Sequence, residues 1–337
     1  MRKIRVIQYG TWMLTHSEHT MLCMRSMPDI YEVVGVCEPN EKRRAFAMKQ
    51  KGYDGLRWFT LDELLNEPNI DAIIVESHEL EQGKDALFFL ERGYHVHMDK
   101  PGGEDKDVYE KLTACAKQKN LIFQPGYMYR YNPAVRKTLE LIQSGVLGDV
   151  MYTELHMSAG YGEAGIRTLE SLKGGMMFYL GCHLCDLMYL IQGMPNKITA
   201  LNQSSGTVDS TAKDFGFALF HYDRGVSFVK TSAAEVDGYS RRQFVIAGTN
   251  GTVEIKPIEL PTPHETITNA NQTKLFLQYK KDGERVTETL EFDIFGRYDD
   301  MMRDFAEIVA GEKQNPFSPD YELTVYNILR SACGLEE

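Results

Sequence analysis

The first third of the chain alternates short apolar runs with longer amphipathic stretches. Strands are expected at four β-rich apolar runs, namely residues 4–9, 32–37, 71–75 and 94–98. Helices are expected over the stretches 15–27, 41–51, 80–92 and 105–119. This alternation, completed by a strand at 121–124, is typical of right-handed βαβ crossovers. It predicts an α/β domain with a doubly wound parallel sheet over residues 1–123.

A capping signal adds a short helix within this domain. Thr60 is followed three residues later by Glu63, and the residues between and after them are apolar enough for one helical face. Threonine and glutamate at this spacing can satisfy each other's backbone N–H groups at a helix start. We therefore expect a capped helix that begins at Thr60.

Beyond residue 124 the hydrophobic pattern changes. After one helix expected over 133–144, strand-like alternation recurs in the segments 150–157, 215–222, 226–232, 244–247 and 252–255. The dipeptide Asn250-Gly251 is a strong hairpin signal, and Tyr222 to Gly225 also has turn composition. Helical patterns return at 298–310 and 319–332. These features predict an α+β domain over 124–337, built on an antiparallel sheet.

Charge and composition narrow the function classes. Lys and Arg number 37 and Asp and Glu number 48, for a net charge of −11, which argues against nucleic-acid binding because that needs clustered basic side chains. No apolar stretch reaches the length of roughly 18 residues that a membrane helix needs. The first residues run into a strand and do not resemble a signal peptide. Six cysteines are too sparse for a disulfide scaffold, so we expect a reduced, cytoplasmic protein without membrane or nucleic-acid partners.

The first strand ends at a loop that is a weak candidate for dinucleotide binding. A dinucleotide fingerprint places glycines at positions 10, 12 and 15, whereas this chain has Gly10, Trp12 and Thr15. Glu38 follows the second strand and could accept hydrogen bonds from both ribose hydroxyls, which favours NAD over NADP. Arg43 lies close behind and leaves NADP open. The alternative interpretation of Glu38 is an acid that interacts favourably with a helix N-terminus.

The fourth predicted strand ends in Asp99-Lys100-Pro101. In open parallel sheets, ligands bind outside the carboxyl ends of the strands, so Lys100 is expected to point toward the same crevice as Gly10 and Glu38. The alternative is an ordinary exposed surface lysine.

A mixed polar and apolar pattern occupies residues 174–190. If this stretch is one helix, Tyr179, His183 and Asp186 lie on one face at positions i, i+4 and i+7. The functional interpretation is a general acid or base, because imidazole titrates near neutral pH. The alternative is a core histidine whose hydrogen bonds are satisfied by Tyr179 and Asp186.

Taken together, these motifs resemble the Gfo/Idh/MocA family of nicotinamide-dependent oxidoreductases. The resemblance covers nearly the whole chain and is carried, in order, by the Gly10 loop, Glu38, Asp99-Lys100-Pro101, Gly126-Tyr-Met-Tyr-Arg130-Tyr-Asn-Pro133, and Gly174-Gly175 followed by Gly181-Cys-His183-Leu-Cys-Asp186. It implies a Rossmann domain and a C-terminal domain with an open, mainly antiparallel sheet, which commonly forms the interface of a homodimer or homotetramer. The implied substrates are sugars, inositols and related polyols, oxidised or reduced at a secondary carbon.

The resemblance also implies roles for individual residues. Lys100 and His183 would be the proton-transfer pair, and Tyr179 would position His183 or touch the substrate. The residues expected to bind the coenzyme are Gly10, Thr11, Trp12, Met13, Glu38, Arg43, Ser77, His78, Asp99 and Lys100. Those expected to line the substrate cleft are Met128, Arg130, Arg167 and Asp186, although an internal ion pair is the alternative for Arg130 and Asp186.

The chain departs from the family pattern in three places. Trp12 and Thr15 replace two glycines, and the bulky indole lies where a pyrophosphate should approach. Tyr179 replaces an acid that family dehydrogenases often carry four residues before the histidine. The family's Pro-Asn segment is absent after the third main strand, so only backbone contacts from Ser77 and His78 are expected there.

Four other functions remain open on the sequence. One is a metal hydrolase, since His95 and His97 share one face of a predicted strand. Another is a metal or redox pair at Cys182 and Cys185, although no second cysteine pair accompanies it. The third is a regulator that keeps the fold and the nucleotide without catalysis. The last is an enzyme that uses transient oxidation by bound NAD for elimination or glycoside cleavage.

Overall fold

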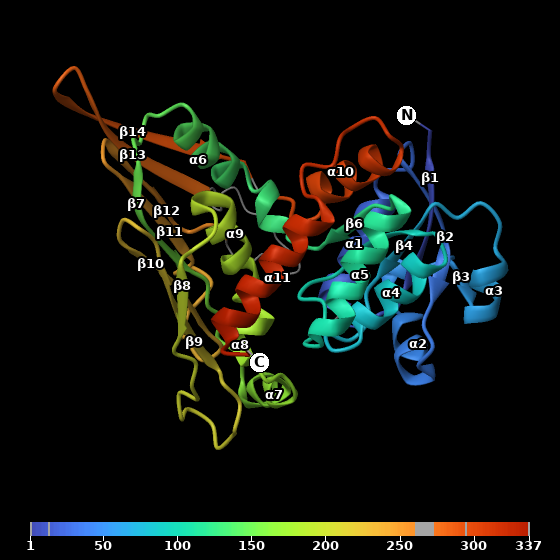
Figure 1. Cartoon of the computed structure of the whole chain (residues 1–337). Helices are drawn as coiled ribbons and strands as arrows, with labels where there is room; N and C mark the ends of the chain where they lie inside the picture. The colour runs from blue at the N-terminus through green and yellow to red at the C-terminus, as the bar shows by residue number, and fades with distance from the viewer. Residues whose placement is uncertain (1, 13, 260–272, 294, 336–337) are drawn as a thin grey trace. The chain divides into compact units, whose positions relative to one another are not determined.

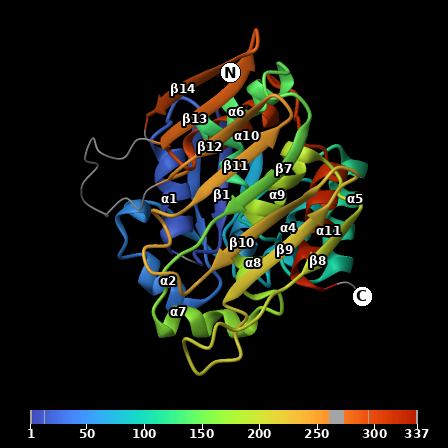
Figure 2. The ribbon, with the colours of Figure 1, turned by 90° about the vertical axis from the view of Figure 1, so that its left-hand side faces the viewer.

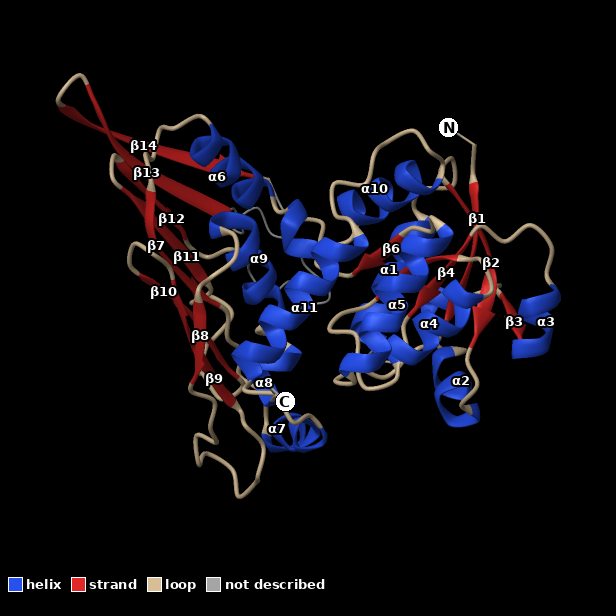
Figure 3. Ribbon diagram, in the orientation of Figure 1, coloured by secondary structure: helices blue, strands red, loops and turns tan. Residues whose placement is uncertain are grey.

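The computed structural model describes residues 2–12, 14–259, 273–293 and 295–335. The chain forms two compact units. The first comprises Met1–Met128 and Gly296–Thr324, and the second comprises Tyr129–Phe295 and Val325–Glu337. Figure 1 follows the chain through its elements, and Figure 3 shows that each unit combines one sheet with several helices.

The sheet of the first unit is entirely parallel. Its strands are β1 (Ile4–Tyr9), β2 (Tyr31–Cys37), β3 (Arg57–Phe59), β4 (Ala72–Val75), β5 (His95–Met98) and β6 (Phe123–Pro125). Their spatial order is β3-β2-β1-β4-β5-β6. The order reverses between β1 and β4, which makes the carboxyl ends of these two strands the topological switch point. The predicted doubly wound sheet is confirmed.

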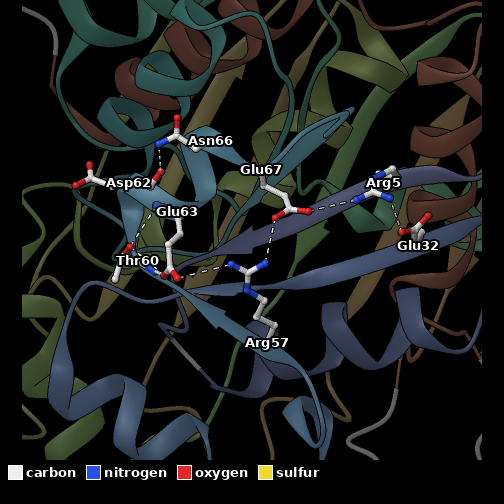
Figure 4. Close-up of polar contacts among 8 residues, drawn as sticks. All are labelled: Arg5, Glu32, Arg57, Thr60, Asp62, Glu63, Asn66 and Glu67. Atoms are coloured by element: carbon white, nitrogen blue, oxygen red, sulfur yellow. Dashed lines mark hydrogen bonds and ion pairs between the residues drawn. The ribbon is translucent and has the colours of Figure 1, made fainter.

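Helices connect these strands at the expected places. They are α1 (Leu14–Arg25), α2 (Glu41–Ala47), α3 (Leu61–Asn66), α4 (Gln82–Glu91) and α5 (Lys106–Lys119), with a 3₁₀ turn at Lys51–Tyr53. Helix α10 (Asp299–Val309) joins this unit from a later part of the chain. The capping box is confirmed at α3, where the Thr60 side chain accepts from the Glu63 N–H and the Glu63 carboxylate accepts from the Thr60 N–H (Figure 4).

Ion pairs tie the amino ends of the first three strands together. Arg5 of β1 donates to Glu32 of β2 at 2.7 Å and lies 3.5 Å from Glu67. Arg57 of β3 donates to the other oxygen of Glu67 at 3.2 Å (Figure 4). These charges lie at the sheet edge opposite the switch point, so they stabilise the fold and leave the carboxyl edge for ligands.

A segment close to the C-terminus belongs to the first unit. The Tyr31 hydroxyl donates to the Met302 carbonyl at 2.5 Å, and the Cys23 thiol donates to the Asp299 carboxylate at 3.3 Å. The Phe305 ring lies 5.7 Å from the buried His97 ring. The contacts therefore group α10 with residues 1–128, whereas the sequence pattern grouped it with residues 124–337.

The sheet of the second unit is mixed and mainly antiparallel, as expected. Its strands are β7 (Val150–His156), β8 (Lys197–Ala200), β9 (Phe215–His221), β10 (Val226–Ser232), β11 (Gln243–Gly248), β12 (Gly251–Ile255), β13 (Thr273–Lys281) and β14 (Glu284–Phe292). They lie in the order β14-β13-β12-β11-β7-β10-β9-β8, and β7 and β10 form the parallel pair. Strands β8, β13 and β14 were not predicted from the sequence, because β13 and β14 contain many charged residues and β8 is only four residues long.

Helices cover one face of this second sheet (Figure 2). The second unit contains α6 (Pro133–Gln143), α7 (Glu163–Thr168), α8 (Gly175–Tyr179) and α9 (Cys182–Gln192), and α11 (Pro319–Cys333) carries the chain from residues of the first unit to residues of the second. Among the described residues, no helix has the length and hydropathy that crossing a bilayer requires.

The single helix expected over 174–190 is wrong. It is broken at Leu180 and Gly181, whose N–H groups both bond to the Met176 carbonyl. A Cβ on Gly181 would lie 2.6 Å from the Met177 carbonyl oxygen, so a glycine is needed for this break. Tyr179 and His183 consequently lie on different helices and do not form one continuous stripe.

Candidate functional site

The first candidate site lies at the carboxyl edge of the parallel sheet, where the Gly10 loop follows β1. Gly10 has φ +88°, and a Cβ there would lie 2.6 Å from the Glu76 carbonyl oxygen and 2.7 Å from the Ser77 nitrogen. The Gly10 N–H donates to the Cys37 carbonyl at 2.8 Å, and the Trp12 N–H donates to the Glu76 carbonyl at 2.9 Å. The loop is therefore held between the ends of β2 and β4, at the switch point.

Replacing Gly10 by alanine is expected to lower the free energy of unfolding by about 2–4 kcal/mol, from positive φ and the clash with Glu76 together. Gly93 is a matched control, because its φ is +90° and a Cβ added there would meet no atom within 4 Å. Gly93→Ala should cost only about 1–2 kcal/mol. Urea unfolding of both variants measures the difference, and equal losses would contradict a close approach at Gly10.

Glu38 is directed at the Gly10 loop. One carboxylate oxygen accepts from the Thr11 N–H and from the Thr11 hydroxyl, both at 2.8 Å. The other oxygen accepts from the Asn40 N–H at 2.8 Å and lies 3.3 Å from an Arg43 guanidinium nitrogen. Asn40, and not Glu38, caps helix α2. Glu38 thus places a buried negative charge beside the loop, and Arg43 places a positive charge next to it.

Trp12 is fixed in the position where the fingerprint has a glycine. Its indole N–H donates to the Glu79 carboxylate at 2.7 Å, and its ring centre lies 4.4 Å from the His78 ring. The Arg43 guanidinium lies 5.5 Å from the same ring. These contacts hold the indole at the carboxyl edge of the sheet. Met13, which the sequence analysis also assigned to the coenzyme, lies outside the described residues.

Lys100 is buried at the end of β5, with only 4% of its surface exposed. The alternative of an ordinary exposed lysine is therefore wrong. Burial raises the pKa of the adjacent Asp99 carboxyl to about 6, against the opposing charge of Lys100. Burial and the Lys100 charge hold the pKa of His16 well below its usual value, so this imidazole is neutral at pH 7. Lys100 is consequently a buried cation among titratable groups, which is frequent at functional sites.

The residues at this edge fit a dinucleotide. Gly10 permits close backbone approach, Glu38 stands at the end of β2, and the Ser77 side chain is buried directly behind the end of β4. Such a coenzyme would be held by backbone groups of the Gly10 loop and of the segment Ser77 to His78. The side chains of Glu38 and Lys100 would also contact it. Trp12 departs from this fit. Its large ring, held by the hydrogen bond to Glu79, replaces the glycine that would let a pyrophosphate approach the loop.

The second candidate site surrounds His183 of α9 in the second unit. His183 is 1% exposed, and its ring centre lies 4.9 Å from the Tyr129 ring, edge to face. The Tyr129 hydroxyl donates to the Glu259 carboxylate, which also pairs with Arg242. Arg242 donates further to the Tyr129 oxygen at 3.0 Å and to the Ser158 carbonyl at 3.1 Å. A buried ion pair thereby fixes the aromatic ring that contacts His183.

This arrangement around His183 was not predicted from the sequence. Tyr129, Arg242 and Glu259 lie in three distant segments of the chain, and no local periodicity relates them. Only Tyr129 carried a signal, since it precedes Arg130 in the segment that resembles the family.

Arg130 and Asp186 form an internal ion pair, which was the alternative interpretation. The distances from Arg130 to the Asp186 carboxylate are 2.9 and 3.0 Å from Nε and 2.6 Å from Nη2. Both side chains are buried. Burial raises the pKa of Asp186, against the opposing effect of Arg130. The pair links the segment after β6 to helix α9, which carries His183.

The remaining candidate residues are Arg167, Tyr179 and Met128. Arg167 is exposed on α7 and pairs with Glu163 at 2.8 Å. Tyr179 is half-buried, and its ring lies 6.4 Å from the Tyr161 ring. Met128 is buried and is the last residue of the first unit before the chain enters the second.

The histidines and cysteines of the metal interpretations have structural partners. His95 accepts from the Ile122 N–H at 2.8 Å, and His97 bonds to the Gln124 side chain at 2.8 Å. Burial lowers the pKa of His97 to about 4. Cys182 and Cys185 are reduced and buried in α9. In the part of the chain that the structure describes, no three His, Cys, Asp or Glu side chains are grouped so that they could hold a metal ion.

Comparison with known proteins assigns both units to one family. Residues 5–127 match the oxidoreductase family with an NAD-binding Rossmann fold, and residues 135–254 match the GFO/IDH/MocA C-terminal domain. The chain therefore belongs to the Gfo/Idh/MocA family of oxidoreductases, as its motifs indicated.

Three similar proteins illustrate the range of this family. The chain is 28% identical over 193 residues to the uncharacterized oxidoreductase YhhX of Escherichia coli, covering 57% of this chain and 54% of that protein. It is 22% identical over 265 residues to trans-1,2-dihydrobenzene-1,2-diol dehydrogenase of Xenopus tropicalis, covering 77% of each. The 3-ketoreductase KijD10 of Actinomadura kijaniata, crystallised with NADP and TDP-benzene, shares the fold with a TM-score of 0.78 at 17% identity, covering 97% of this chain and 96% of that one. The matched segments span from about two fifths to three fifths of the length of the first curated relatives.

Proposed function

We propose that this protein transfers hydride between a nicotinamide coenzyme and a secondary alcohol or ketone of a sugar, inositol or related polyol. Lys100 and His183 are the proposed proton-transfer groups, and Tyr179 positions His183 or touches the substrate. The observation that carries the proposal is the buried Lys100 at the switch-point edge of the sheet that also presents the Gly10 loop and Glu38. Ligands of doubly wound sheets bind at this edge.

In the proposed reaction the coenzyme transfers the hydride and the side chains transfer the proton. The nicotinamide, when bound, accepts or supplies the hydride. In oxidation, His183 or the neutral amine form of Lys100 takes the proton of the substrate hydroxyl, and in reduction the protonated form of the same group returns the proton to the carbonyl oxygen. The ammonium group of Lys100 also stabilises negative charge that develops on that oxygen. Burial of both side chains strengthens these interactions because little water screens them.

The substrate class is supported by the chemistry that relatives' names describe. One relative is named a dihydrodiol dehydrogenase and one similar structure a 3-ketoreductase, so the two names together describe oxidation at a hydroxyl-bearing carbon and reduction of a keto group. We propose the same conversion on polyols for this chain. The test is a panel of sugars, sugar nucleotides, inositols and dihydrodiols, assayed by the absorbance of reduced nicotinamide with NAD and NADP. Turnover of a polyol supports the proposal, and coenzyme binding without any turnover contradicts it.

The choice between NAD and NADP is proposed to depend on Glu38 and Arg43 together. NAD is expected to be preferred, because the Glu38 carboxylate repels a 2′-phosphate. Arg43 lies 3.3 Å from that carboxylate, however, and a guanidinium is well suited to bind phosphate. We therefore propose that the chain binds NAD and also accepts NADP.

Replacing Arg43 by alanine is expected to weaken NADP binding about tenfold and to change NAD binding about twofold or less, because only NADP carries the 2′-phosphate. Arg44→Ala is the matched control, since Arg44 is the adjacent arginine and its guanidinium lies 5.9 Å from the centre of the Trp58 ring. Calorimetric titration with each coenzyme measures both effects. An equal loss of affinity for both coenzymes would contradict the proposal that Arg43 binds the 2′-phosphate.

One observation favours a second function, a nucleotide-binding regulator without catalysis. Trp12 is held by Glu79, His78 and Arg43 at the place where a pyrophosphate should approach. A regulator would bind coenzyme yet show no turnover with any substrate, and Lys100→Met would leave its coenzyme affinity and partner binding intact.

We propose that the second sheet assembles two or four copies of the chain. Helices cover one face of this sheet (Figure 2). On the opposite face, the strand register aligns Leu219, Phe228, Glu154, Val245, Glu254 and Phe276 across neighbouring strands, and Phe276 is exposed. Apolar side chains that stay partly exposed on a sheet face can be covered by a second copy of the chain. Mass photometry tests for a dimer or tetramer.

The reduced state of all six cysteines supports the cytoplasmic location that the sequence predicts.

A further inference from the structure

Glu76 buries a carboxyl group at the end of β4, and the function described so far does not use it. Its surface is 1% exposed, and neither carboxyl oxygen has a partner with hydrogen-bond geometry among the described residues. Leaving such a group buried costs free energy. The backbone of Glu76 is equally constrained, since its N–H donates to the Tyr9 carbonyl at 2.7 Å and its carbonyl accepts from Trp12. A buried acid of this kind at a ligand-binding edge calls for a functional explanation.

Strand register places Glu76 beside Asp99. Val75 of β4 pairs with Met98 of β5, and the Asp99 N–H donates to the Val75 carbonyl at 2.9 Å. Glu76 and Asp99 directly follow this pair, so the register brings the two acids together at the ends of neighbouring parallel strands. Asp99 is also buried, and one of its oxygens lies 3.1 Å from the position that a Cβ on Gly126 would take.

Lys100 is the cation whose charge acts on both carboxyls. The other groups facing them are the Thr20 hydroxyl and His16 of α1, the Tyr53 hydroxyl, and Glu79 of the loop after β4. His16 lies 3.8 Å from Asp99, is neutral, and is itself faced by Arg297, His19 and the Tyr298 hydroxyl.

Two buried carboxylates beside one ammonium would leave an uncompensated negative charge, which a low-dielectric interior disfavours. One proton retained on the pair balances the charge of Lys100. Burial and the charge of Asp99 raise the pKa of Glu76 well above its usual value, against smaller opposite effects of Thr20 and Lys100. At neutral pH the proton therefore resides on Glu76, and Asp99 carries the charge.

We propose that Glu76 and Asp99 act as a carboxyl pair that shares one proton and supplies a single negative charge beside Lys100, and that either acid can carry that charge. Glu76 is a positioning residue in this scheme, because it acts on the reaction through Asp99 and Lys100. The catalytic part of the inference rests on the proposed function, whereas the sharing of the proton does not.

The direct test follows the carboxyl groups themselves by ¹³C NMR of protein labelled at Asp and Glu side chains. In the wild type, Asp99 should ionise near its expected pKa of about 6 while Glu76 stays protonated through neutral pH. Asp99→Asn removes the charge that opposes ionisation of Glu76, so the midpoint of Glu76 should fall by at least about one pH unit. Glu81→Gln, at an exposed acid after β4, should leave that midpoint unchanged. An unmoved Glu76 midpoint in Asp99→Asn would overturn the proposal.

A double-mutant cycle then tests the effect on turnover. Glu76→Gln should lower kcat about twofold to threefold and Asp99→Asn about tenfold, because each leaves one acid to carry the charge. The double variant leaves none and should lose about a thousandfold, well beyond the product of the single losses. Strict additivity would refute the pair.

These two tests separate the possible failures. If no polyol is turned over but the carboxyl midpoints are coupled, the proposed function fails and the carboxyl pair stands. If the double variant does not fold, which its unfolding transition shows, the NMR titration of the single variants decides alone.

Discussion

Lys100→Met is expected to lower kcat by about 10³-fold or more while it changes coenzyme affinity much less. Methionine keeps the length and apolar volume of the buried side chain, so the loss reports the ammonium group. General acid–base catalysis and stabilisation of a developing oxyanion each contribute about 10²–10⁴-fold to such rates. Steady-state kinetics with the best substrate of the panel, together with calorimetric coenzyme binding, measures both quantities.

Two companion variants make this result specific. Lys106→Met changes a lysine of the same unit that is half exposed and paired with Glu110 across one helical turn, and it should keep kcat within about twofold. His183→Asn should cause a loss comparable to that of Lys100→Met, because His183 is the other proposed proton-transfer group. Undiminished turnover in Lys100→Met would reject the role of the lysine, and undiminished turnover in His183→Asn would reject that of the histidine.

Asp186→Asn is expected to lower the free energy of unfolding by about 3–5 kcal/mol. The variant removes the carboxylate that faces the buried guanidinium of Arg130 at 2.6 to 3.0 Å, and breaking a buried ion pair from one side commonly costs this much. Because α9 also carries His183, a loosened helix should reduce kcat as well. Urea unfolding gives the first quantity, and kinetics at a temperature where the variant remains folded gives the second.

The control for Asp186→Asn is an ion pair on the surface. Glu163→Gln breaks the pair between Glu163 and Arg167 on α7, and solvent screens this pair, so the unfolding midpoint should not change measurably. A loss below about 1 kcal/mol in Asp186→Asn would show that the Arg130 pair does not hold α9 in place.

Part of the candidate site could be predicted from residues that directly follow the expected strands. Gly10, Glu38 and Lys100 each follow a strand of a recognisable βαβ pattern, and strands of one parallel sheet end at a common edge. The ion pair of Arg130 with Asp186 could be stated only as an alternative, because a sequence does not tell which buried charges meet.

Other features had no local signal. The break between α8 and α9 depends on the close approach of Gly181 to the Met177 carbonyl, which helical periodicity does not show. The support of the Tyr129 ring by Arg242 and Glu259 joins three remote segments. Strands β13 and β14 are paired through their backbones while their side chains stay mostly polar, so hydrophobic alternation missed them.

The sequence by itself determined the family, the parallel and antiparallel sheets, and the residues that end the parallel strands, because periodicity, caps and turns act over a few residues. Only the tertiary structure decided that Lys100 is buried, that Glu76 lies beside Asp99, and that α10 packs with the first sheet. Burial and charge balance depend on side chains that are far apart in the chain, and those contacts form only when the strands pair and the helices cover them.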